Sequence, residues 1–397
     1  MAGGNKDLRS AKMGKKDEFY TQLEDIENEL KHYKTFFENK VVFCNCDDPY
    51  ESNFFKYFAL NFNKLKLKKL ISTCYAGSPL ITEQLSLFDV NGLIISKKNA
   101  KNPYKIEITS VEDENKDGAI DLSDVETLLK TKKNTLTLLK GDGDFRSKEC
   151  LELLKEADVV VTNPPFSLFR EYISLLIDYN KKFVVIGNMN AITYKDFFQY
   201  IKDNKLWAGY GFNLSMIFKT PYKNTLESNR KYVKAHGYDP DKNYVKNPGM
   251  CWFTNIDIDK RKEKMILYRK YDKNKYPNYF NFDGIDVNKV DDIPIDYYGY
   301  MGVPITFLDK YNPEQFKLIG LGTYIEKKYI HTVTENKKTI EYIDRKTKET
   351  KWKFPYTVNE RKIGNSLRIE ENGQPTSSPY GRIVIQSIES EECNNGN

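Results

Sequence analysis

The stretch Asp158-Val159-Val160-Val161-Thr162-Asn163-Pro164-Pro165-Phe166 determines how the rest of the chain is interpreted. Its β-branched run, Val159 to Val161, is typical of a buried strand. The strand must end at Pro164, because a proline has no N–H to donate to a neighbouring strand. The second proline keeps the turn extended and stiff. The stretch therefore predicts a rigid loop at the carboxyl end of a strand, which is where open α/β sheets bind ligands.

The predicted loop offers two hydrogen-bond acceptors beside an aromatic ring. Asn163 supplies a side-chain carbonyl, Pro164 a backbone carbonyl without an adjacent N–H, and Phe166 a flat face. Such acceptors suit a planar ring with an exocyclic amino group, because they stabilise the charge that develops on the amine as it is methylated. The tetrapeptide resembles the catalytic motif of S-adenosylmethionine-dependent amino methyltransferases. A proline-rich turn after an ordinary strand is the alternative interpretation.

Strand and helix patterns alternate around this loop. We expect strands at residues 40–46, 69–74, 136–139, 158–162 and 182–186, and helices at 23–37, 149–155, 168–179 and 194–204. This alternation predicts right-handed crossovers and a mainly parallel sheet. Residues 206–221 and 248–257 are expected to add a hairpin at its edge. A Gly-x-Gly-x-x-Gly segment is missing after the first strand, so the chain lacks the dinucleotide-binding fingerprint.

The pattern divides the chain into three predicted parts. Residues 1–16 form a basic arm that either contacts phosphates or is simply solvated. Residues 17–258 form the catalytic domain, in which we interpret residues 77–133 as an insertion that contains a small hairpin. Residues 259–397 form a recognition region where cations alternate with aromatic residues, a composition that suits phosphate contact and base stacking or else a solvated surface. The candidate DNA contacts there are Lys260, Arg261, Lys262, Lys264, Arg269 and Lys270.

Composition narrows the class of protein. The net charge of +6, from 62 basic and 56 acidic residues, permits a nucleic-acid partner without requiring one. The six cysteines lack metal-ligand spacing and the chain has three histidines, so we expect no metal site. Reduced cysteines fit a cytoplasmic protein better than a disulfide framework. We expect no membrane span, because no apolar run approaches about 20 residues, and no secretory signal, because the N-terminus lacks an apolar core.

Five local segments resemble the EcoRI-type adenine-specific DNA modification methylases. They are residues 17–22, 44–58, 141–147, 160–169 and 301–308. The resemblance extends from about Asp17 to Gly320 and leaves out residues 77–133 and the tail. It implies an α/β fold with a Rossmann-like class I methyltransferase sheet, helices on both of its faces, an insertion and a C-terminal DNA-recognition region. It also implies S-adenosyl-L-methionine as the cofactor and N6 of adenine in double-stranded DNA as the target.

The resemblance implies a role for each segment. Asn163, Pro164, Pro165 and Phe166 would form the catalytic motif, with Phe166 stacking on a base extruded from the duplex. The cofactor contacts would be Phe19, Tyr20, Thr21, Cys46, Asp47, Asp48, Asp144 and Phe145. Asp144 would accept a hydrogen bond from the adenine amino group of the cofactor, although it could instead cap a helix. The carboxylates around Asp47 replace the usual glycine-rich loop and are assigned to the ammonium group or the ribose hydroxyls.

We therefore expect a monomeric DNA adenine methyltransferase. It would be the modification enzyme of a type II restriction-modification system, with a cognate endonuclease as a partner, or an orphan or phage methylase. Cytosine-C5 methylation is excluded, because none of the six cysteines follows a proline. Cytosine-N4 methylation of DNA, adenine-N6 methylation of RNA and glutamine methylation of protein use similar acceptors. A non-catalytic DNA-binding module would explain the basic region but not the cofactor segments.

Overall fold

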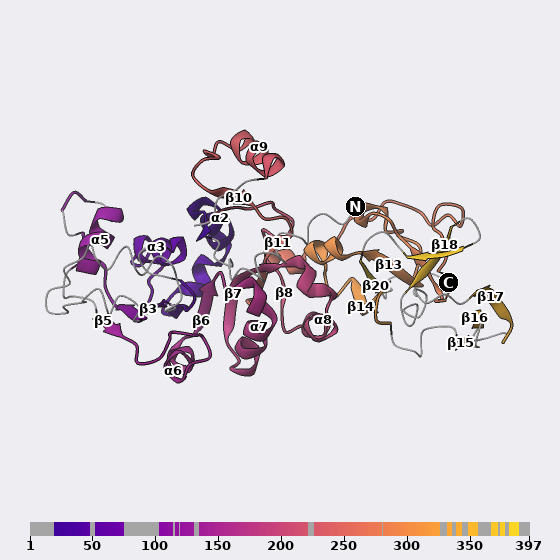
Figure 1. Ribbon diagram of the computed structural model, residues 1–397, viewed down its shortest axis with the longest axis horizontal. Helices are drawn as coiled ribbons and strands as arrows, with labels where there is room; N and C mark the ends of the chain where they lie inside the picture. The colour runs from indigo at the N-terminus through magenta and orange to yellow at the C-terminus, as the bar shows by residue number, and fades with distance from the viewer. Residues whose placement is uncertain are drawn as a thin grey trace, which may run out of the picture. The chain divides into compact units, whose positions relative to one another are not determined.

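The computed structural model divides the chain into two compact units, which are described separately. Unit 1 comprises residues 1–189 and 208–256, and unit 2 comprises residues 190–207 and 257–397. Figure 1 labels their elements. The structure describes residues 20–47, 52–74, 103–113, 116–118, 120–130, 135–220, 226–279, 281–325, 332–335, 339–343, 348–355, 367–371, 374–377 and 381–388.

A mixed sheet of eight strands forms the centre of unit 1, in the order β5-β4-β3-β2-β6-β7-β11-β8. The strands are β2 (Val41–Cys44), β3 (Lys69–Thr73), β4 (Tyr104–Ile108), β5 (Thr135–Leu138), β6 (Val159–Thr162), β7 (Lys182–Asn188), β8 (Trp207–Ala208) and β11 (Met250–Thr254). The four central strands β3, β2, β6 and β7 are parallel. Strand β4 runs antiparallel to its neighbours β3 and β5, and strand β11 runs antiparallel to β7. An α/β fold is thus confirmed, with a mixed rather than mainly parallel sheet.

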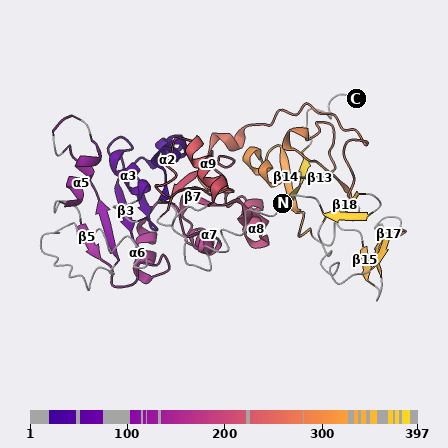
Figure 2. The same cartoon turned by 45° about the horizontal axis from the view of Figure 1, so that its top comes forward.

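Helices precede, link or follow the strands of this sheet along the chain. They are α2 (Leu23–Leu30), η1 (Lys31–Phe37), α3 (Asn53–Leu60), α5 (Leu122–Lys130), α6 (Lys148–Glu156), η2 (Phe166–Leu168), α7 (Phe169–Asp178) and η3 (Met189–Thr193). Serine side chains cap the N-termini of α3 and α6. Ser52 accepts a hydrogen bond from the backbone N–H of Phe54, and Ser147 accepts one from the backbone N–H of Cys150. Figures 1 and 2 show α3 on one side of β3 and α6 on the other.

Strand β4 corrects our interpretation of residues 77–133 as an insertion that interrupts the sheet. It lies inside the sheet, where Ile106 is opposite Ser72 of β3 and Leu136 of β5. Tyr104, Ile106 and Ile108 are buried, so one face of β4 packs into the core. Within the described residues β5 pairs with β4 alone. Most of the remaining insertion, residues 77–102, lies outside the described part of the chain.

A second, three-stranded sheet in unit 1 was not predicted. It consists of β1 (Tyr20–Thr21), β9 (Ile217–Lys219) and β10 (Tyr244–Lys246), with β9 in the middle and both neighbours antiparallel to it. Helix α9 (Glu227–Ala235) lies between β9 and β10 in the chain. The strand that we expected at residues 206–221 is therefore divided between two sheets. The part of it that forms β8 lies beside its expected partner β11, and these two strands end the sheet after β7, so the expected edge pair is present without β9.

Unit 2 is organised around the sheet β12-β13-β20-β14. These strands are β12 (Gly284–Asp286), β13 (Tyr300–Pro304), β14 (Phe316–Leu321) and β20 (Arg382–Ser387). The 3₁₀ helix η4 (Asp259–Lys262) precedes β12, η5 (Val290–Asp292) connects β12 to β13, and η6 (Ile305–Lys310) connects β13 to β14. Helix α8 (Lys195–Lys202) packs near β14, where Lys202 donates to the Ile319 carbonyl at 2.9 Å. Smaller sheets comprise β15 (Thr332–Glu335), β16 (Thr339–Ile343) and β17 (Thr350–Pro355), and β18 (Arg368–Glu371) with β19 (Gln374–Ser377).

The division into units bears on the predicted domains. The chain passes from unit 1 to unit 2 after Ile256, close to the expected boundary at residue 258. Helix α8, which we placed in the catalytic domain, groups with unit 2. Assigning catalysis to residues 17–258 and target recognition to residues 259–397 stays a prediction. Within the described ranges, no helix has the length and apolar character needed to span a membrane.

Candidate active site

The Asn-Pro-Pro-Phe loop follows one of the most deeply buried strands of the protein. β6 lies between β2 and β7, and all four of its residues are buried. The chain leaves the strand at Asn163 and enters η2 at Phe166. Pro164 is buried, whereas Asn163, Pro165 and Phe166 are partly exposed. The predicted loop at the carboxyl end of a strand is therefore confirmed.

Strand β1 holds the side chain of Asn163. Its Nδ2 donates a long hydrogen bond, 3.4 Å, to Thr21 Oγ1. Thr21 is itself 3% exposed, and its carbonyl accepts from Asn53 Nδ2 at 2.7 Å. Because the amide nitrogen faces Thr21, the carbonyl Oδ1 points the other way, and this oxygen is shielded from solvent. The predicted segment around Tyr20 and Thr21 thus lies beside the loop; Phe19 is outside the described residues.

The Phe166 ring contacts a second strand of the same small sheet. It meets Phe218 of β9 with centroids 6.3 Å apart and planes at 77°. This edge-to-face geometry is favourable for aromatic pairs and limits the rotation of the ring. Phe218 is fully buried and is opposite Thr21 in the β1–β9 register. The small sheet therefore contacts both ends of the Asn-Pro-Pro-Phe loop.

Asp47 joins three elements at the same edge of the sheet. Its carboxylate accepts hydrogen bonds from Ser52 Oγ, at 2.7 Å, and from Thr162 Oγ1. Its backbone carbonyl accepts from Ser72 Oγ at 2.6 Å. The buried carboxylate thereby connects the end of β2 to the first turn of α3 and to the residue before Asn163. Its predicted contact with the cofactor stays a prediction, and Asp48 lies outside the described residues.

Asn45 is a buried polar residue that we did not predict. Its Oδ1 accepts from the Tyr172 hydroxyl and from Cys46 Sγ. Its Nδ2 has no hydrogen-bond acceptor among the described residues and is shielded from solvent. A buried donor of this kind costs about 1–3 kcal/mol, which a ligand oxygen would recover. The sequence signal that could have identified Asn45 is its position as a polar residue directly after an apolar strand. At the next residue, burial and the nearby Asp47 raise the pKa of the Cys46 thiol.

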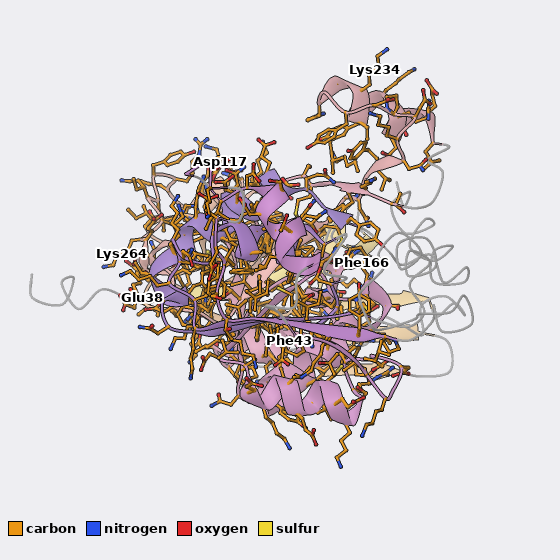
Figure 3. The ribbon with its side chains drawn as sticks, turned by 90° about the vertical axis from the view of Figure 1, so that its left-hand side faces the viewer. Glu38, Phe43, Asp117, Phe166, Lys234 and Lys264 are labelled. Atoms are coloured by element: carbon orange, nitrogen blue, oxygen red, sulfur yellow. The ribbon has the colours of Figure 1, made fainter. Side chains whose placement is uncertain are left out.

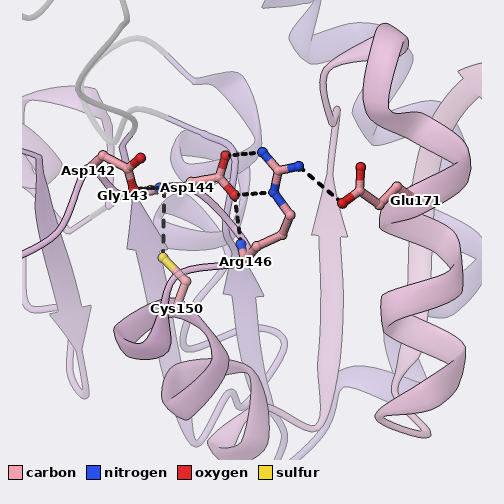
Figure 4. Close-up of polar contacts among 6 residues, drawn as sticks. All are labelled: Asp142, Gly143, Asp144, Arg146, Cys150 and Glu171. Atoms are coloured by element: carbon pink, nitrogen blue, oxygen red, sulfur yellow. Dashed lines mark hydrogen bonds and ion pairs between the residues drawn. The ribbon is translucent and has the colours of Figure 1, made fainter.

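An ion-pair network surrounds Asp144 in the loop after β5 (Figure 4). Its Oδ1 accepts from the backbone N and from Nε of Arg146, both at 2.8 Å, and its Oδ2 from Nη2 at 2.7 Å. Nη1 of Arg146 reaches Glu171 of α7 at 3.0 Å. These bonds to the charged form hold the pKa of Asp144 below its ordinary value. Hydrogen bonds from Arg146 thus use three of the about four acceptor positions of the Asp144 carboxylate, and one position remains on Oδ2. The alternative role as a helix cap is wrong, because Ser147 caps α6.

Phe145 and Gly143 fix this loop against the sheet. The buried Phe145 ring packs edge-on against Tyr172, with centroids 5.1 Å apart. Gly143 has φ of +74°, and a Cβ there would collide with the Cys74 carbonyl and lie 2.8 Å from Pro103 Cβ. Only glycine fits both constraints. Tyr172 also bonds Asn45, so contacts link the loops after β2 and β5.

Comparison with known proteins places the chain in a family. The model of the family described as "Adenine-specific methyltransferase EcoRI" matches residues 7–386. The chain belongs to this family. It is 46% identical over 328 residues to the Type II methyltransferase M.EcoRI of Escherichia coli, covering 82% of this chain and 91% of that protein.

Two further relatives come from Mycoplasma. The Type II methyltransferase M.MgeORF184P of Mycoplasma genitalium is 38% identical over 314 residues, covering 78% of this chain and 84% of that protein. M.MpnI of Mycoplasma pneumoniae is 37% identical over 320 residues, covering 78% and 83%. No solved structure matches the chain.

Membership of the EcoRI methyltransferase family decides between the activities considered above. The chain is an adenine-specific methyltransferase enzyme, so the resemblance seen in the sequence is confirmed. Cytosine-N4 methylation and a non-catalytic DNA-binding module are excluded. The described part of the chain contains no group of three or more His, Cys, Asp or Glu residues placed to hold a metal ion.

The six predicted DNA-binding cations of this methyltransferase lie in unit 2 in two kinds of environment. Lys260 forms an ion pair with Asp309. Arg261 stacks on the Trp207 ring at 4.1 Å, and burial lowers its pKa. These two side chains would have to leave partners within unit 2 to reach a phosphate. The others, Lys262, Lys264, Arg269 and Lys270, are exposed, although Lys262 pairs with Asp257 at 2.6 Å and Arg269 with Asp292 at 3.5 Å. Their contact with DNA stays a prediction.

Proposed function

We propose that this adenine-specific methyltransferase transfers a methyl group from S-adenosylmethionine to N6 of adenine in double-stranded DNA. It would act as a cytoplasmic monomer and as the modification enzyme of a type II restriction-modification system, whose endonuclease cuts the same site. The family match and three relatives named Type II methyltransferases support the proposal. So does the strand order β3-β2-β6-β7 with antiparallel β11, which is compatible with a class I methyltransferase sheet.

The observation that carries the proposal is the convergence of separate segments on the catalytic loop. Thr21 of β1 contacts Asn163, and Asp47 at the end of β2 contacts Thr162 beside it. The loop after β5 reaches the end of β2 through the contacts of Tyr172 with Phe145 and Asn45. All of these lie at or beside the carboxyl ends of parallel strands, where α/β sheets bind ligands.

The donors and acceptors at this edge suit S-adenosylmethionine, which supplies a methyl group bound to a positively charged sulfur. Asp144 has one acceptor position left on Oδ2 for the adenine amino group, and Arg146 keeps the carboxylate ionised. Asn45 Nδ2 can donate to an oxygen of the cofactor. Asp47 adds negative charge that favours a cation. Tyr20 and Thr21 lie on the side of the catalytic loop and are assigned to the methionine part.

The chain's own residues would then activate the target amine. Asn163 Oδ1 and the Pro164 carbonyl accept the amino hydrogens and stabilise the charge that develops on N6. The shielded position of Oδ1 strengthens this effect, because few water molecules compete. Phe166 stacks on the extruded adenine and keeps its amino group at the loop. No strong base is needed before attack, because the charge appears only as the methyl group arrives.

The test is Asn163→Ala in a single-turnover methylation assay on duplex DNA. Removing one preorganised group of this kind should slow methyl transfer by about 10²–10³-fold. Binding of cofactor and DNA should be unchanged, because the interaction forms mainly in the transition state. The control is Asn28→Ala, the same change on the exposed surface of α2, which should leave the rate unchanged. Near wild-type methylation by Asn163→Ala would refute the mechanism.

A second variant separates chemistry from base extrusion. Phe166→Ala should weaken the productive complex, because stacking on a base contributes on the order of 1–3 kcal/mol. A 2-aminopurine at the target position reports extrusion by its fluorescence. Methylation-sensitive sequencing of DNA from cells that express the protein identifies that position. We expect Phe166→Ala to reduce the fluorescence change, whereas Asn163→Ala should preserve it.

A further inference from the structure

Residues 226–246 form a folded arm on unit 1 with very little apolar core. This α9 arm consists of α9, β10 and the loop between them. In α9 only Val233 is buried. Polar contacts hold the arm together instead: Asn229 Nδ2 donates to the Lys246 carbonyl at 2.9 Å, and the Lys246 N–H donates back to Asn229 Oδ1 at 2.9 Å. Arg230 adds a bond to the Pro240 carbonyl at 2.9 Å.

The α9 arm is attached to the sheet that positions the catalytic loop. Its strand β10 pairs with β9, whose Phe218 contacts Phe166. The third strand, β1, supplies Thr21 to Asn163. Figure 3 shows Lys234 at the far end of the arm, which stands clear of the other side chains of unit 1. The arm and the catalytic loop therefore belong to one unit, and the loop contacts the small sheet of which the arm's strand β10 is part.

Cations dominate the surface of the α9 arm. Its sequence has five of them, Arg230, Lys231, Lys234, Lys242 and Lys246, against three acids, Glu227, Asp239 and Asp241. Two cations pair within the arm, Arg230 with Asp241 at 2.6 Å and Lys231 with Glu227 at 3.6 Å. Lys246 lies over the Tyr232 ring at 3.8 Å. Lys234 and Lys242 are exposed and form no ion pair with any described residue.

We propose that the α9 arm is a clamp that contacts the phosphate backbone of the DNA duplex beside the target adenine. This rests on the proposed function. A protein partner would need an apolar centre in its interface, yet the arm exposes only one large apolar side chain, Leu226. Exposed lysines on a stiff support suit phosphates, which are bound through charge and without regard to base sequence. The arm holds the duplex in place while the base is extruded toward Phe166.

The test is the double variant Lys234→Gln/Lys242→Gln. Its matched control is Lys68→Gln/Lys155→Gln, two exposed lysines that precede β3 and β6 and so lie at the opposite, amino edge of the parallel strands. The affinity of each protein for a 30-base-pair duplex is measured over a range of salt concentrations. Each lost phosphate contact should reduce the slope of log K against log salt by about 0.9, so the arm variant should lose about 1.8. The control should keep the wild-type slope.

Two further readouts make the outcomes distinct. Calorimetric binding of S-adenosylmethionine should be the same in all three proteins, which shows that they are folded. In the arm variant KM for DNA should rise while kcat at saturating DNA stays the same, as expected for lost ground-state binding. A wild-type slope in the arm variant, or an equal loss in the control, would overturn the clamp but leave the proposed function intact. A wild-type protein that does not methylate duplex DNA would overturn the proposed function itself.

Discussion

Strand β4 joins the outer strand β5 to the rest of the sheet, so we expect residues 77–133 to be needed for binding of the cofactor. Replacing them with a short Gly-Ser linker removes β4 and, within the described residues, the neighbour of β5. It also removes Pro103, against which Gly143 packs directly before Asp144. We therefore expect the replacement to abolish S-adenosylmethionine binding. A segment that only interrupted the sheet would instead be dispensable.

The magnitude follows from what β4 buries. Tyr104, Ile106 and Ile108 are 2%, 1% and 0% exposed. Burying a large apolar side chain contributes about 1.5–3 kcal/mol, so the three together contribute roughly 5–9 kcal/mol. The free energy of unfolding of a typical domain is about 5–15 kcal/mol. Deleting the strand thus removes much or all of the free energy of unfolding. The point variant Ile106→Ala should cost about 2–5 kcal/mol and leave a folded protein.

Urea unfolding and calorimetry measure both effects. The fluorescence of Trp252, which is buried in β11, reports the unfolding of unit 1. The control is Ile266→Ala, the same change at a side chain that is 89% exposed, which should alter stability by less than about 0.5 kcal/mol. The reasoning is refuted if the linker variant folds and binds S-adenosylmethionine within tenfold of wild type, about 1.4 kcal/mol. It is also refuted if Ile106→Ala is as stable as Ile266→Ala.

Two other contacts at the site predict measurable effects. Arg146→Gln should raise the pKa of Asp144 toward the ordinary value, because it removes the hydrogen bonds that favour the carboxylate. Because the ionised carboxylate is the proposed acceptor, cofactor affinity is lost as the pH falls through this pKa. A calorimetric series from about pH 6 to about pH 3, which spans the ordinary range of an aspartate, should place the loss at higher pH in the variant; equal midpoints would contradict this. Thr21→Val should slow single-turnover methylation by about two- to tenfold without changing DNA affinity, because one hydrogen bond to Asn163 contributes about 0.5–1.5 kcal/mol. Thr21→Ser should retain the rate, and an equal loss in both variants would show that the hydroxyl is not responsible.

The parallel centre of the sheet was predictable from local sequence. Strands buried on both faces appear as continuous apolar runs, rich in β-branched residues. The expected strands at residues 40–46, 69–74, 158–162 and 182–186 correspond to β2, β3, β6 and β7. Because strand ends carry the candidate site, the placement of Asp47 and Asn163 followed from the same runs. The loop after β5 followed from its Gly-Asp pattern.

Strand β4 illustrates what local sequence could not reveal. Its residues alternate between apolar and charged, so only one face is buried, and the surrounding segment is itself charged. The charge of Glu107 is paired within β4 and across to the neighbouring strand, with Lys105 at 2.6 Å and with Lys69 of β3. Such a strand becomes recognisable only once its neighbour is known. The orphan Nδ2 of Asn45 likewise depends on packing rather than on spacing.

The small sheet of β1, β9 and β10 escaped prediction for a simpler reason, and it matters more for function. Its strands have two or three residues each, too few to show any periodicity. Yet β1 contacts Asn163, β9 contacts Phe166, and β10 ends the α9 arm. The three strands are hydrogen-bonded side by side, with β9 in the middle. If the arm binds the duplex backbone, a displacement of β10 would therefore reach Phe166 through β9 and Asn163 through β1. Substitutions in the arm should therefore affect base extrusion by way of DNA binding, whereas Thr21→Val acts on Asn163 alone.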